Sequence, residues 1–308
     1  MSVIPLIFVH TGYQKHLEIV IPQAERCNDQ VYLLGDDSNK NVAAQWFHID
    51  KYIDDRYEIF KSKFINMSSN TAEFELNCFK RYFVCYQFAK IQGIDRFCMM
   101  DSDCLVYENL SNLGLQEYDA GASIPEDQSN MNWTASPHCS LWSMDALNDF
   151  LNYLLTAYDE ENIEPLLKKW NYHQESSVPG GICDMTLLYL WMKKNANRLK
   201  LFNGLCIKNG KTFDHFLHVS EGYSVGDFRV NGFLEMKVIR FIKGKPYFKY
   251  KDGTWIQSCT IHAQGARKKY ISLLSPDKYS IVECYKCKVK SDLNRGINFV
   301  KRKLVNHK

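Results

Sequence analysis

A long amphipathic helix that leads directly into a buried strand is the feature that most restricts how this chain can fold. Apolar side chains recur at helical spacing over residues 71–92, and a short apolar run over residues 97–100 follows almost at once. This order predicts a helix with one core-facing side and then a strand buried on both faces. Strands of that kind occur in parallel sheets that are covered by helices. We therefore expect an α/β fold.

Other segments repeat this alternation. The opening run up to Val9 is apolar and too short to span a membrane, and it lacks the basic segment and cleavage site of a signal peptide, so it predicts a first core strand. Together these segments indicate a mostly parallel, Rossmann-like sheet. We expect helices at residues 14–27, 144–158 and 185–194, and strands at residues 30–34, 118–124 and 139–143.

The chain has a different pattern after Phe216. Short β-prone segments are separated by residues 243–245 and 251–253, whose glycines favour hairpin turns. This pattern predicts a smaller antiparallel β appendage. The end of the chain is basic and amphipathic. Its cations are Lys288, Lys290, Arg295, Lys301, Arg302 and Lys303, and its apolar stripe is Leu293, Ile297, Val300 and Leu304.

Composition excludes some classes of function. The 308 residues carry a net charge of only +3, and aromatic residues are not interleaved with lysines and arginines, so we expect no nucleic-acid partner. Aromatic residues make up 14% of the chain, which favours flat contacts in the core or with ring-shaped ligands such as sugars. The eleven cysteines have no regular spacing, which is typical of a reducing compartment, so we expect a cytoplasmic protein.

Two carboxylates follow the apolar run that ends at Met100. Asp101 and Asp103 are two residues apart, and carboxylates at this spacing at a strand end can share one Mg²⁺ or Mn²⁺ ion. The same pattern also occurs in solvated turns, where the side chains cap their own backbone. A metal site therefore needs a further ligand elsewhere in the chain.

A histidine near the other end of the chain is a candidate for that ligand. An extended run reaches His262, and Gly265, Arg267 and Lys268 follow it. An imidazole can complete a carboxylate-bound Mn²⁺ site, and a cation at a helix start can meet a diphosphate. A lone histidine is more often a buried structural residue, and such cations more often form a solvated helix face. The inference therefore depends on the combination.

These two motifs, in this order, resemble those of glycosyltransferases with the GT-A fold, and most closely glycosyltransferase family 8 and related bacterial polysaccharide and lipopolysaccharide enzymes. The family has an Asp-Xaa-Asp motif in its first half and a His-Xaa-Xaa-Gly-Xaa-Xaa-Lys motif near its end. Here the matching residues are Asp101, Asp103, His262, Gly265 and Lys268. The resemblance implies a bound Mn²⁺ ion, with the nucleotide at the carboxyl ends of the parallel strands, in agreement with the switch-point rule for open sheets.

The resemblance covers about residues 3–270 and implies a nucleotide pocket. The loop after the first strand would receive the base and ribose, and Asp36 after the second strand would accept a hydrogen bond from one of them. The same residues are also ordinary strand-end turn formers. The nucleotide site implied in this way comprises His10, Thr11, Gly12, Asp36, Ser102, Gly265 and Lys268.

Two further residues resemble groups that the family places near the donor sugar. Arg81 precedes the metal strand and would point toward the sugar or diphosphate, although a surface ion pair with Glu73 or Glu75 is the alternative. Asp184 would orient sugar hydroxyls or deprotonate the acceptor, although it could also cap a helix. The family often has Gln after this Asp, whereas this chain has Met185, which leaves both the retaining and the inverting outcome open.

The expected organisation is one catalytic body and a tail. Residues 1–275 would form a single GT-A domain, with a nucleotide-sugar half at about residues 1–125 and an acceptor half at about residues 126–275. Residues 276–308 would form the basic tail, which could contact a membrane surface. A candidate acceptor wall consists of Trp133, Trp142, Tyr172 and Trp191, most of which could equally be core residues.

The sequence thus predicts a metal-dependent glycosyltransferase. It would move a sugar from a nucleoside diphosphate, with UDP as the first choice, to a glycan or lipid-linked acceptor in surface polysaccharide synthesis. Two alternatives come from other classes. A haloacid-dehalogenase-like phosphohydrolase also has a strand that ends in Asp-Xaa-Asp, but this chain has Leu105 where that class usually has Thr or Val. A non-catalytic glycan-binding protein would need the aromatic residues but not the metal site.

Overall fold

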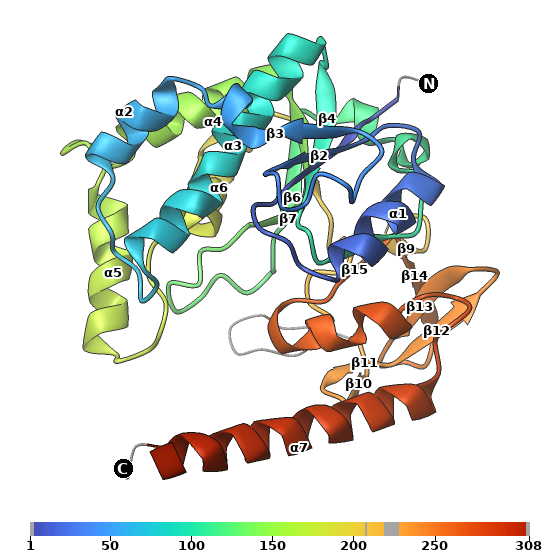
Figure 1. Cartoon of the computed structure of the whole chain (residues 1–308). Helices are drawn as coiled ribbons and strands as arrows, with labels where there is room; N and C mark the ends of the chain where they lie inside the picture. The colour runs from blue at the N-terminus through green and yellow to red at the C-terminus, as the bar shows by residue number, and fades with distance from the viewer. Residues whose placement is uncertain (1–2, 207, 219–227, 306–308) are drawn as a thin grey trace.

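The structure, a computed structural model, describes residues 3–206, 208–218 and 228–305. A seven-stranded sheet occupies the upper part of the molecule in Figure 1, with helices around it, and a smaller β region lies below. The long helix α7 (Ile281–Val305) crosses the bottom of that view. This arrangement confirms the expected α/β fold with an antiparallel appendage and a C-terminal helix.

The central sheet is mostly parallel. In spatial order its strands are β3 (Trp46–His48), β2 (Val31–Gly35), β1 (Leu6–Val9), β4 (Arg96–Met100), β7 (Ser136–Ser143), β6 (Ala120–Ser123) and β8 (Leu201–Asn203). The first four run parallel, β7 is antiparallel to both of its neighbours, and β8 is parallel to β6. The carboxyl ends of β1 and β4 therefore lie side by side.

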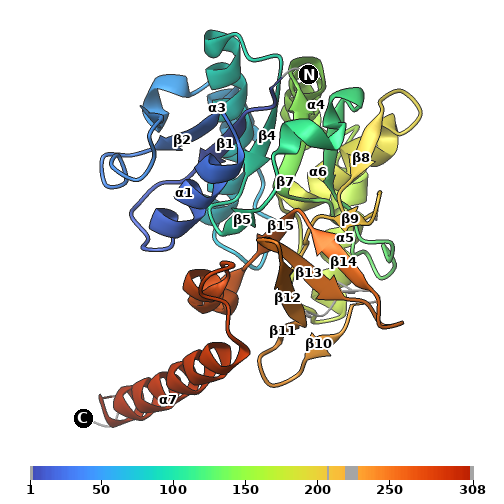
Figure 2. The same ribbon diagram turned by 90° about the vertical axis from the view of Figure 1, so that its right-hand side faces the viewer.

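Helices cover this sheet on both faces (Figure 2). The helices over residues 17–195 are α1 (Leu17–Cys27), α2 (Arg56–Lys63), α3 (Ala72–Gln92), α4 (Met144–Thr156), α5 (Glu164–Glu175) and α6 (Asp184–Asn195). Helix α1 packs on one face of the sheet, and α3, α4 and α6 pack on the other. Alternate side chains of β4 fill two separate cores: Phe97 and Met99 pack with α3, α4 and α6, whereas Cys98 and Met100 pack with α1 and the β region. Burial on both faces explains why this strand is a continuous apolar run in the sequence.

Helix α3 was predicted correctly because its ends carry clear signals. Thr71 caps its start, where the side-chain oxygen accepts a hydrogen bond from the Phe74 N–H at 3.3 Å. Gly93 ends it in the left-handed conformation, with φ of 65°. A polar cap at the start and a glycine after the last turn are the usual limits of a helix. The chain then enters β4 within three residues.

The expected hairpins are present in the β region. A four-stranded sheet has the order β12 (Ile239–Ile242), β13 (Lys245–Lys249), β14 (Trp255–Ser258) and β9 (Lys211–Thr212). The turn between β12 and β13 holds Lys243 and Gly244 with φ of 49° and 78°, as a two-residue hairpin turn requires. A separate pair consists of β10 (Val230–Asn231) and β11 (Met236–Lys237). Strand β9 precedes Phe216, so the β region begins earlier than predicted.

Short elements complete the described chain. Strands β5 (Cys104–Val106) and β15 (Thr260–His262) pair antiparallel and join the β region to the end of β4. The 3₁₀ helices are η1 (Ile49–Tyr52), η2 (Leu110–Leu113), η3 (Leu115–Glu117) and η4 (Gly265–Leu273). In the part of the chain that the structure describes, we find no helix with the length and apolar character needed to cross a membrane.

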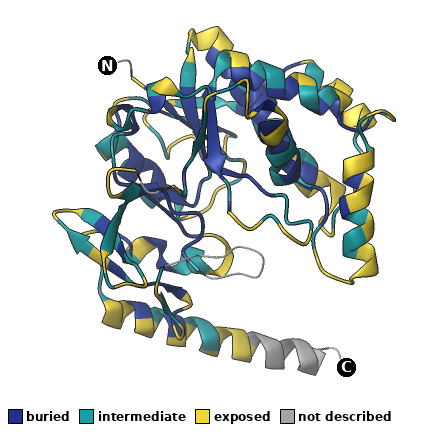
Figure 3. Cartoon of the chain, turned by 180° about the vertical axis from the view of Figure 1, so that it is seen from behind, coloured by how far each residue is buried: buried dark blue, intermediate teal, exposed yellow. Residues whose placement is uncertain are grey.

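The proposed acceptor wall is wrong for two of its four residues. Figure 3 shows burial concentrated in the sheet and on the inner sides of the helices. Trp142 and Trp191 belong to that interior, each with 1% of its surface exposed, so neither ring can meet an acceptor. Trp133 and Tyr172 are half-buried and stay candidates. Trp142 lies on β7 and Trp191 on α6, and burying such large apolar rings in the core stabilises the fold.

Candidate functional site

The two motif carboxylates lie in a turn at the carboxyl end of β4. The Asp101 N–H donates to the His138 carbonyl of β7 at 2.8 Å, and the Cys104 N–H donates back to the Asp101 carbonyl at 3.1 Å. The Asp103 carbonyl accepts from the Ala263 N–H at 3.0 Å. One of these backbone bonds closes the turn, and the other two attach it to β7 and to the residue after β15. Asp103 is buried, whereas Asp101 stays partly exposed.

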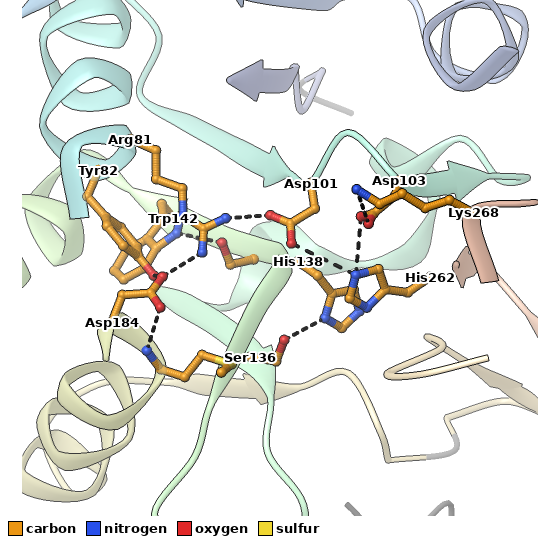
Figure 4. Close-up of polar contacts among 12 residues, drawn as sticks. Arg81, Tyr82, Asp101, Asp103, Ser136, His138, Trp142, Asp184, His262 and Lys268 are labelled. Atoms are coloured by element: carbon orange, nitrogen blue, oxygen red, sulfur yellow. Dashed lines mark hydrogen bonds and ion pairs between the residues drawn. The ribbon is translucent and has the colours of Figure 1, made fainter. Parts of the chain in front are cut away.

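The pairing of β5 with β15 brings His262 to this turn. His262 lies opposite Cys104 in the ladder, directly beside Asp103. Its Nε2 atom is 3.3 Å from Asp103 Oδ1 and 3.9 Å from Asp101 Oδ2. One ligand atom from each of the three residues lies within 4.8 Å of the others. Figure 4 shows them converging on one point, as a shared metal ion requires.

The His262 imidazole is held in one orientation. Its Nδ1 atom lies 2.6 Å from the His215 carbonyl, so Nδ1–H donates there and Nε2 faces the carboxylates. The ring of His138 stacks on it at 4.4 Å and 3°. Burial alone would lower the pKa of His262, but the hydrogen bond and charge of Asp103, with the charge of Asp101, raise it to about 9. Without a metal, both ring nitrogens are therefore protonated at neutral pH, and the imidazole is positively charged.

Lys268 approaches the same carboxylates from η4. Its Nζ atom is 3.2 Å from Asp103 Oδ2. Burial would raise the pKa of Asp103, but His262 and Lys268 hold it well below its usual range. Gly265, at the start of η4, has φ of 60°, a left-handed conformation that favours glycine. This bend directs the chain after β15 back toward the carboxylates.

Arg81 and Asp184 lie on the other side of Asp101. Arg81 of α3 contacts an Asp101 oxygen and lies 2.5 Å from an oxygen of Asp184, the first residue of α6. The Tyr82 hydroxyl donates to Asp184 at 3.2 Å. Burial would lower the pKa of Arg81, but the charges of Asp101 and Asp184 raise it, so the guanidinium stays charged. Figure 4 shows Arg81 bridging the two carboxylates.

Arg81 pairs with Asp101 and Asp184 and does not form the surface ion pair with Glu75 that was the alternative. Glu75, one of the alternative partners, instead accepts hydrogen bonds from Ser68 at 2.7 Å and from Asn70 at 2.9 Å. The helix-cap alternative for Asp184 is wrong, because Cys183 occupies the N-cap position of α6 and Asp184 is its first helical residue. The Oδ1 atom of Asp184 accepts from the neighbouring Met185 N–H at 2.9 Å, and Oδ2 faces Arg81 and Tyr82.

The loop after β1 lies at the same edge of the sheet. Phe8 pairs with Met100, so the residues that follow each strand, including His10 and the buried Ser102, leave the sheet together. Burial and the charge of Lys268 lower the pKa of His10, against the charges of the nearby carboxylates. The structure thus brings the first-strand loop, the Asp turn and η4 together.

Asp36 is already engaged within its own turn. It accepts from the Gly12 N–H and from the Ser38 N–H and hydroxyl. These bonds lower its pKa, with the Ser38 side chain as the largest cause. Thr11 is exposed beside them. Asp36 therefore shapes the loop that holds Gly12, and any contact with a nucleotide would be in addition to that role.

Sequence reasoning missed the residues behind His262. His138, Asp214, His215 and Lys237 surround the imidazole or its backbone, and all are buried. They come from β7, from the irregular segment after β9 and from β11, and single residues at these positions carry no pattern that would have identified them. Only the pairing of distant strands places them here.

Comparisons with known proteins give remote likenesses. No family model matches this chain, and no curated protein matches it. Mouse xyloside xylosyltransferase 1, in its apo form, is similar with a TM-score of 0.48 and 10% identity, over 68% of this chain and 88% of that chain. The bifunctional glycosyltransferase WbbM, also apo, gives 0.39 and 11%, over 93% and 52%. The glycosyltransferase GlyE of Streptococcus pneumoniae TIGR4 gives 0.29 and 14%, over 66% and 45%. At this distance the activity has to follow from the site residues themselves.

Proposed function

We propose that this protein is a metal-dependent glycosyltransferase. It would move a sugar from a nucleoside diphosphate, UDP as the first choice, to a glycan or lipid-linked acceptor in surface polysaccharide synthesis. The observation that carries the proposal is the meeting of Asp101, Asp103, His262 and Lys268 at the carboxyl end of β4. That edge is where open α/β sheets bind their ligands.

The ligand set fits Mn²⁺, with Mg²⁺ as the second choice. Two carboxylates and one imidazole combine oxygen and nitrogen donors, whereas Mg²⁺ prefers oxygen alone. Asp101, Asp103 and His262 would hold the ion, which when bound would supply positive charge where the diphosphate leaves. The Lys268 ammonium, 3.2 Å from Asp103, lies close enough to contact the same diphosphate. Its charge would stabilise the leaving group further.

Arg81 and Asp184 would serve the sugar side of the reaction. A carboxylate beside an oxocarbenium-like centre can stabilise that centre or accept a proton from the acceptor hydroxyl. Asp184 suits this role because Arg81, Tyr82 and its own helix start fix its position. Both the retaining and the inverting course are compatible with a carboxylate at this place.

The two alternative classes fit the geometry less well. A phosphohydrolase would need Asp101 as a nucleophile, but one of its oxygens contacts Arg81 and the other faces His262. A non-catalytic glycan-binding protein would need exposed aromatic rings, and Trp142 and Trp191 are in the core. It would also have no use for a cluster of carboxylates and imidazole.

We also propose that α7 holds the protein on an anionic membrane surface at the cytoplasmic face, where a lipid-linked acceptor would be found. Exposed apolar residues recur on one side of this helix: Val282, Tyr285, Val289, Leu293 and Ile297. Of the predicted cations, Lys290 and Arg295 are exposed beside them, as is Lys286, whereas Lys288 is buried and pairs with Glu235 and Asp292. The side chains of Val300, Lys301, Arg302, Lys303 and Leu304 lie outside the described residues. An apolar stripe flanked by cations favours binding in the headgroup region of anionic lipids.

A ligand screen tests the central proposal. Melting temperatures would be measured with each nucleoside diphosphate, with and without Mn²⁺, because a ligand that binds only the folded state raises apparent stability. We expect UDP with Mn²⁺ to stabilise the chain more than either alone. The matching UDP-sugars would then be tested for Mn²⁺-dependent release of UDP. A chain that binds no nucleoside diphosphate and releases none from any nucleotide sugar is not a glycosyltransferase of this kind.

A further inference from the structure

A buried ion pair lies directly behind His262. Asp214 and Lys237 contact each other, and their side chains are 0% and 4% exposed. The second oxygen of Asp214 accepts a hydrogen bond from the His262 backbone N–H at 2.9 Å. The Lys237 ammonium also donates to the Phe216 carbonyl at 2.6 Å. One ion pair therefore reaches both the backbone of His262 and the short segment that faces it.

This segment, residues 214–217, contacts both the side chain and the backbone of His262. The His215 carbonyl accepts from the imidazole Nδ1–H, and the Phe216 ring stacks on the imidazole at 5.7 Å and 18°. The Leu217 N–H donates to the His262 carbonyl at 3.0 Å. His215 thus lies between two residues, Asp214 and Phe216, that Lys237 binds directly. Its carbonyl is placed by the ion pair on both sides.

Stability alone gives little reason for charges at this position. Burying an ammonium and a carboxylate costs a large desolvation free energy, and an apolar pair of similar volume is often as stable. What an apolar pair cannot do is bind the His262 N–H and the Phe216 carbonyl at the same time. The ion pair therefore fixes the positions of the His262 and Phe216 backbones, which apolar packing alone would not fix.

We infer that Asp214 and Lys237 are positioning residues, which hold the His262 imidazole where its Nε2 atom and the two carboxylates can bind one divalent cation. The inference rests on the metal site of the proposed function. Partners that orient a ligating histidine typically change metal affinity by about 10- to 100-fold when they are removed. Neither residue would touch the cation itself.

The test measures Mn²⁺ binding alone, from the paramagnetic resonance signal of the free ion, so that it does not depend on activity. The double variant Asp214→Asn with Lys237→Met removes both charges and keeps the side-chain volumes. We expect it to fold and to bind Mn²⁺ about tenfold more weakly than the wild type. In a His262→Ala background the same two substitutions should change the Kd by less than about twofold, because the effect acts through His262.

The control removes a comparable ion pair far from the site. Asp54 and Arg56 pair at 2.9 Å with side chains 11% and 21% exposed, so Asp54→Asn with Arg56→Met should bind Mn²⁺ as the wild type does. If the first double variant fails to fold, Asp214→Asn alone keeps the shape of the side chain and should weaken binding in the same His262-dependent way.

The outcomes separate the inference from the proposed function. A folded double variant with the wild-type Kd overturns the inference alone, and so does an equal loss of affinity with and without His262. A wild-type chain that binds no Mn²⁺ overturns the metal site and the inference together.

Discussion

At the scale of single residues, each motif carboxylate already contacts a cation of the protein. Arg81 contacts Asp101, Lys268 contacts Asp103, and His262 carries a proton that both carboxylates favour. A divalent ion bound to Nε2 has to displace that proton, and it competes with Lys268 for Asp103. Binding of the ion would therefore free the Lys268 ammonium for an anionic ligand. Metal and diphosphate should consequently bind cooperatively.

Replacing Asp103 should abolish this chemistry without unfolding the chain. In Asp103→Asn the site loses one metal-binding carboxylate, and we expect sugar transfer to fall at least about 100-fold, or about 3 kcal/mol in barrier. Steady-state rates of Mn²⁺-dependent nucleotide release measure this. Asp252→Asn, in the exposed turn before β14, is the control. Wild-type turnover in Asp103→Asn would remove Asp103 from the metal site.

Replacing His262 should weaken two ligands together. In His262→Ala the ion loses its nitrogen donor, and the diphosphate loses the ion that would help to bind it. We expect the Kd for Mn²⁺ and the Kd for the nucleoside diphosphate in the presence of Mn²⁺ each to rise about tenfold or more, measured by separate calorimetric titrations. His48→Ala, on β3, controls for loss of a histidine. If both affinities stay at wild-type values, His262 is a core residue only.

At the scale of elements, a buried lysine links α5 to the segment that precedes β7. Lys169 is 3% exposed, and its ammonium donates to the Asn132 carbonyl at 2.8 Å and contacts the Trp133 carbonyl at 3.4 Å. No carboxylate of the described residues forms an ion pair with it. Burial lowers the pKa of Lys169 to about 8. The half-buried Trp133, still a candidate for the acceptor site, depends on this link.

The lowered pKa makes the contribution of Lys169 depend on pH. Between pH 8 and about 10.5, the lysine is neutral in the folded chain and protonated in the unfolded chain, so the unfolded chain binds more protons and stability rises with pH. The free energy of unfolding of the wild type, relative to Lys169→Met, should therefore increase by up to about 3 kcal/mol across this window. Urea unfolding at pH 7.5 and pH 10 measures it, with Lys51→Met as the exposed-lysine control. A constant or falling difference would contradict the prediction.

Helix α7 offers a prediction that separates lipid binding from folding. Leu293 and Ile297 are 63% and 52% exposed, so replacing both with Ser should leave the fold intact. Removing two large apolar side chains should weaken sedimentation with anionic vesicles at low salt by about tenfold or more. The matched control is Ile59→Ser with Ile91→Ser, a pair on α2 and α3 that is 50% and 56% exposed. Equal vesicle binding by both variants would show that α7 does not bind lipid.

Elements with strong local signals were predictable, and elements defined by distant contacts were not. Helix α3 and strand β4 have long periodicity, a polar cap and continuous apolar character, and the structure confirms both. Helix α2 has only eight residues, and α5 is rich in charged and polar residues, so neither stands out in the sequence as a helix. The pairing of β5 with β15 could not be predicted, because neither three-residue strand indicates which distant part of the chain it pairs with.

The residues of the candidate site also differ in how far the sequence could predict them. The motif residues Asp101, Asp103 and His262 could be named from their residue types and order, and the structure brings them together. The residues that orient them, such as Asp214 and Lys237, could not, because only tertiary structure makes them neighbours. The same limit explains the wrong assignment of Trp142 and Trp191, because the sequence alone does not show whether an aromatic side chain is buried in a core or exposed in a binding site.

At the scale of the whole molecule, the two cores lie on opposite faces of one sheet and share its strands. Side chains of β4 belong to both, and β5 with β15 links the β region to the same strand. The division into a nucleotide-sugar half and an acceptor half at about residue 125 stays a prediction. A boundary there would fall between β6 and β7, which pair with each other in the sheet.

We therefore expect the body to unfold as one unit. Circular dichroism and tryptophan fluorescence should show coincident transitions in urea, because neither core can lose the shared strands and persist. Trp142 reports the core beneath α4, and Trp255 reports the β region. Two separated transitions, with the β region lost first, would show that it is an independent domain.

The meeting of β5 and β15 also has a consequence during synthesis. Asp103 emerges from the ribosome before His262 and Lys268, which lie about 160 residues further along the chain. Until then the turn after β4 lacks its pairing strand and the two cations that offset Asp103, although Arg81 is already present to pair with Asp101. A nascent or truncated chain could form much of the central sheet and still lack the site. A fragment that ends before β15 should therefore bind neither the metal nor the nucleotide of the proposed function.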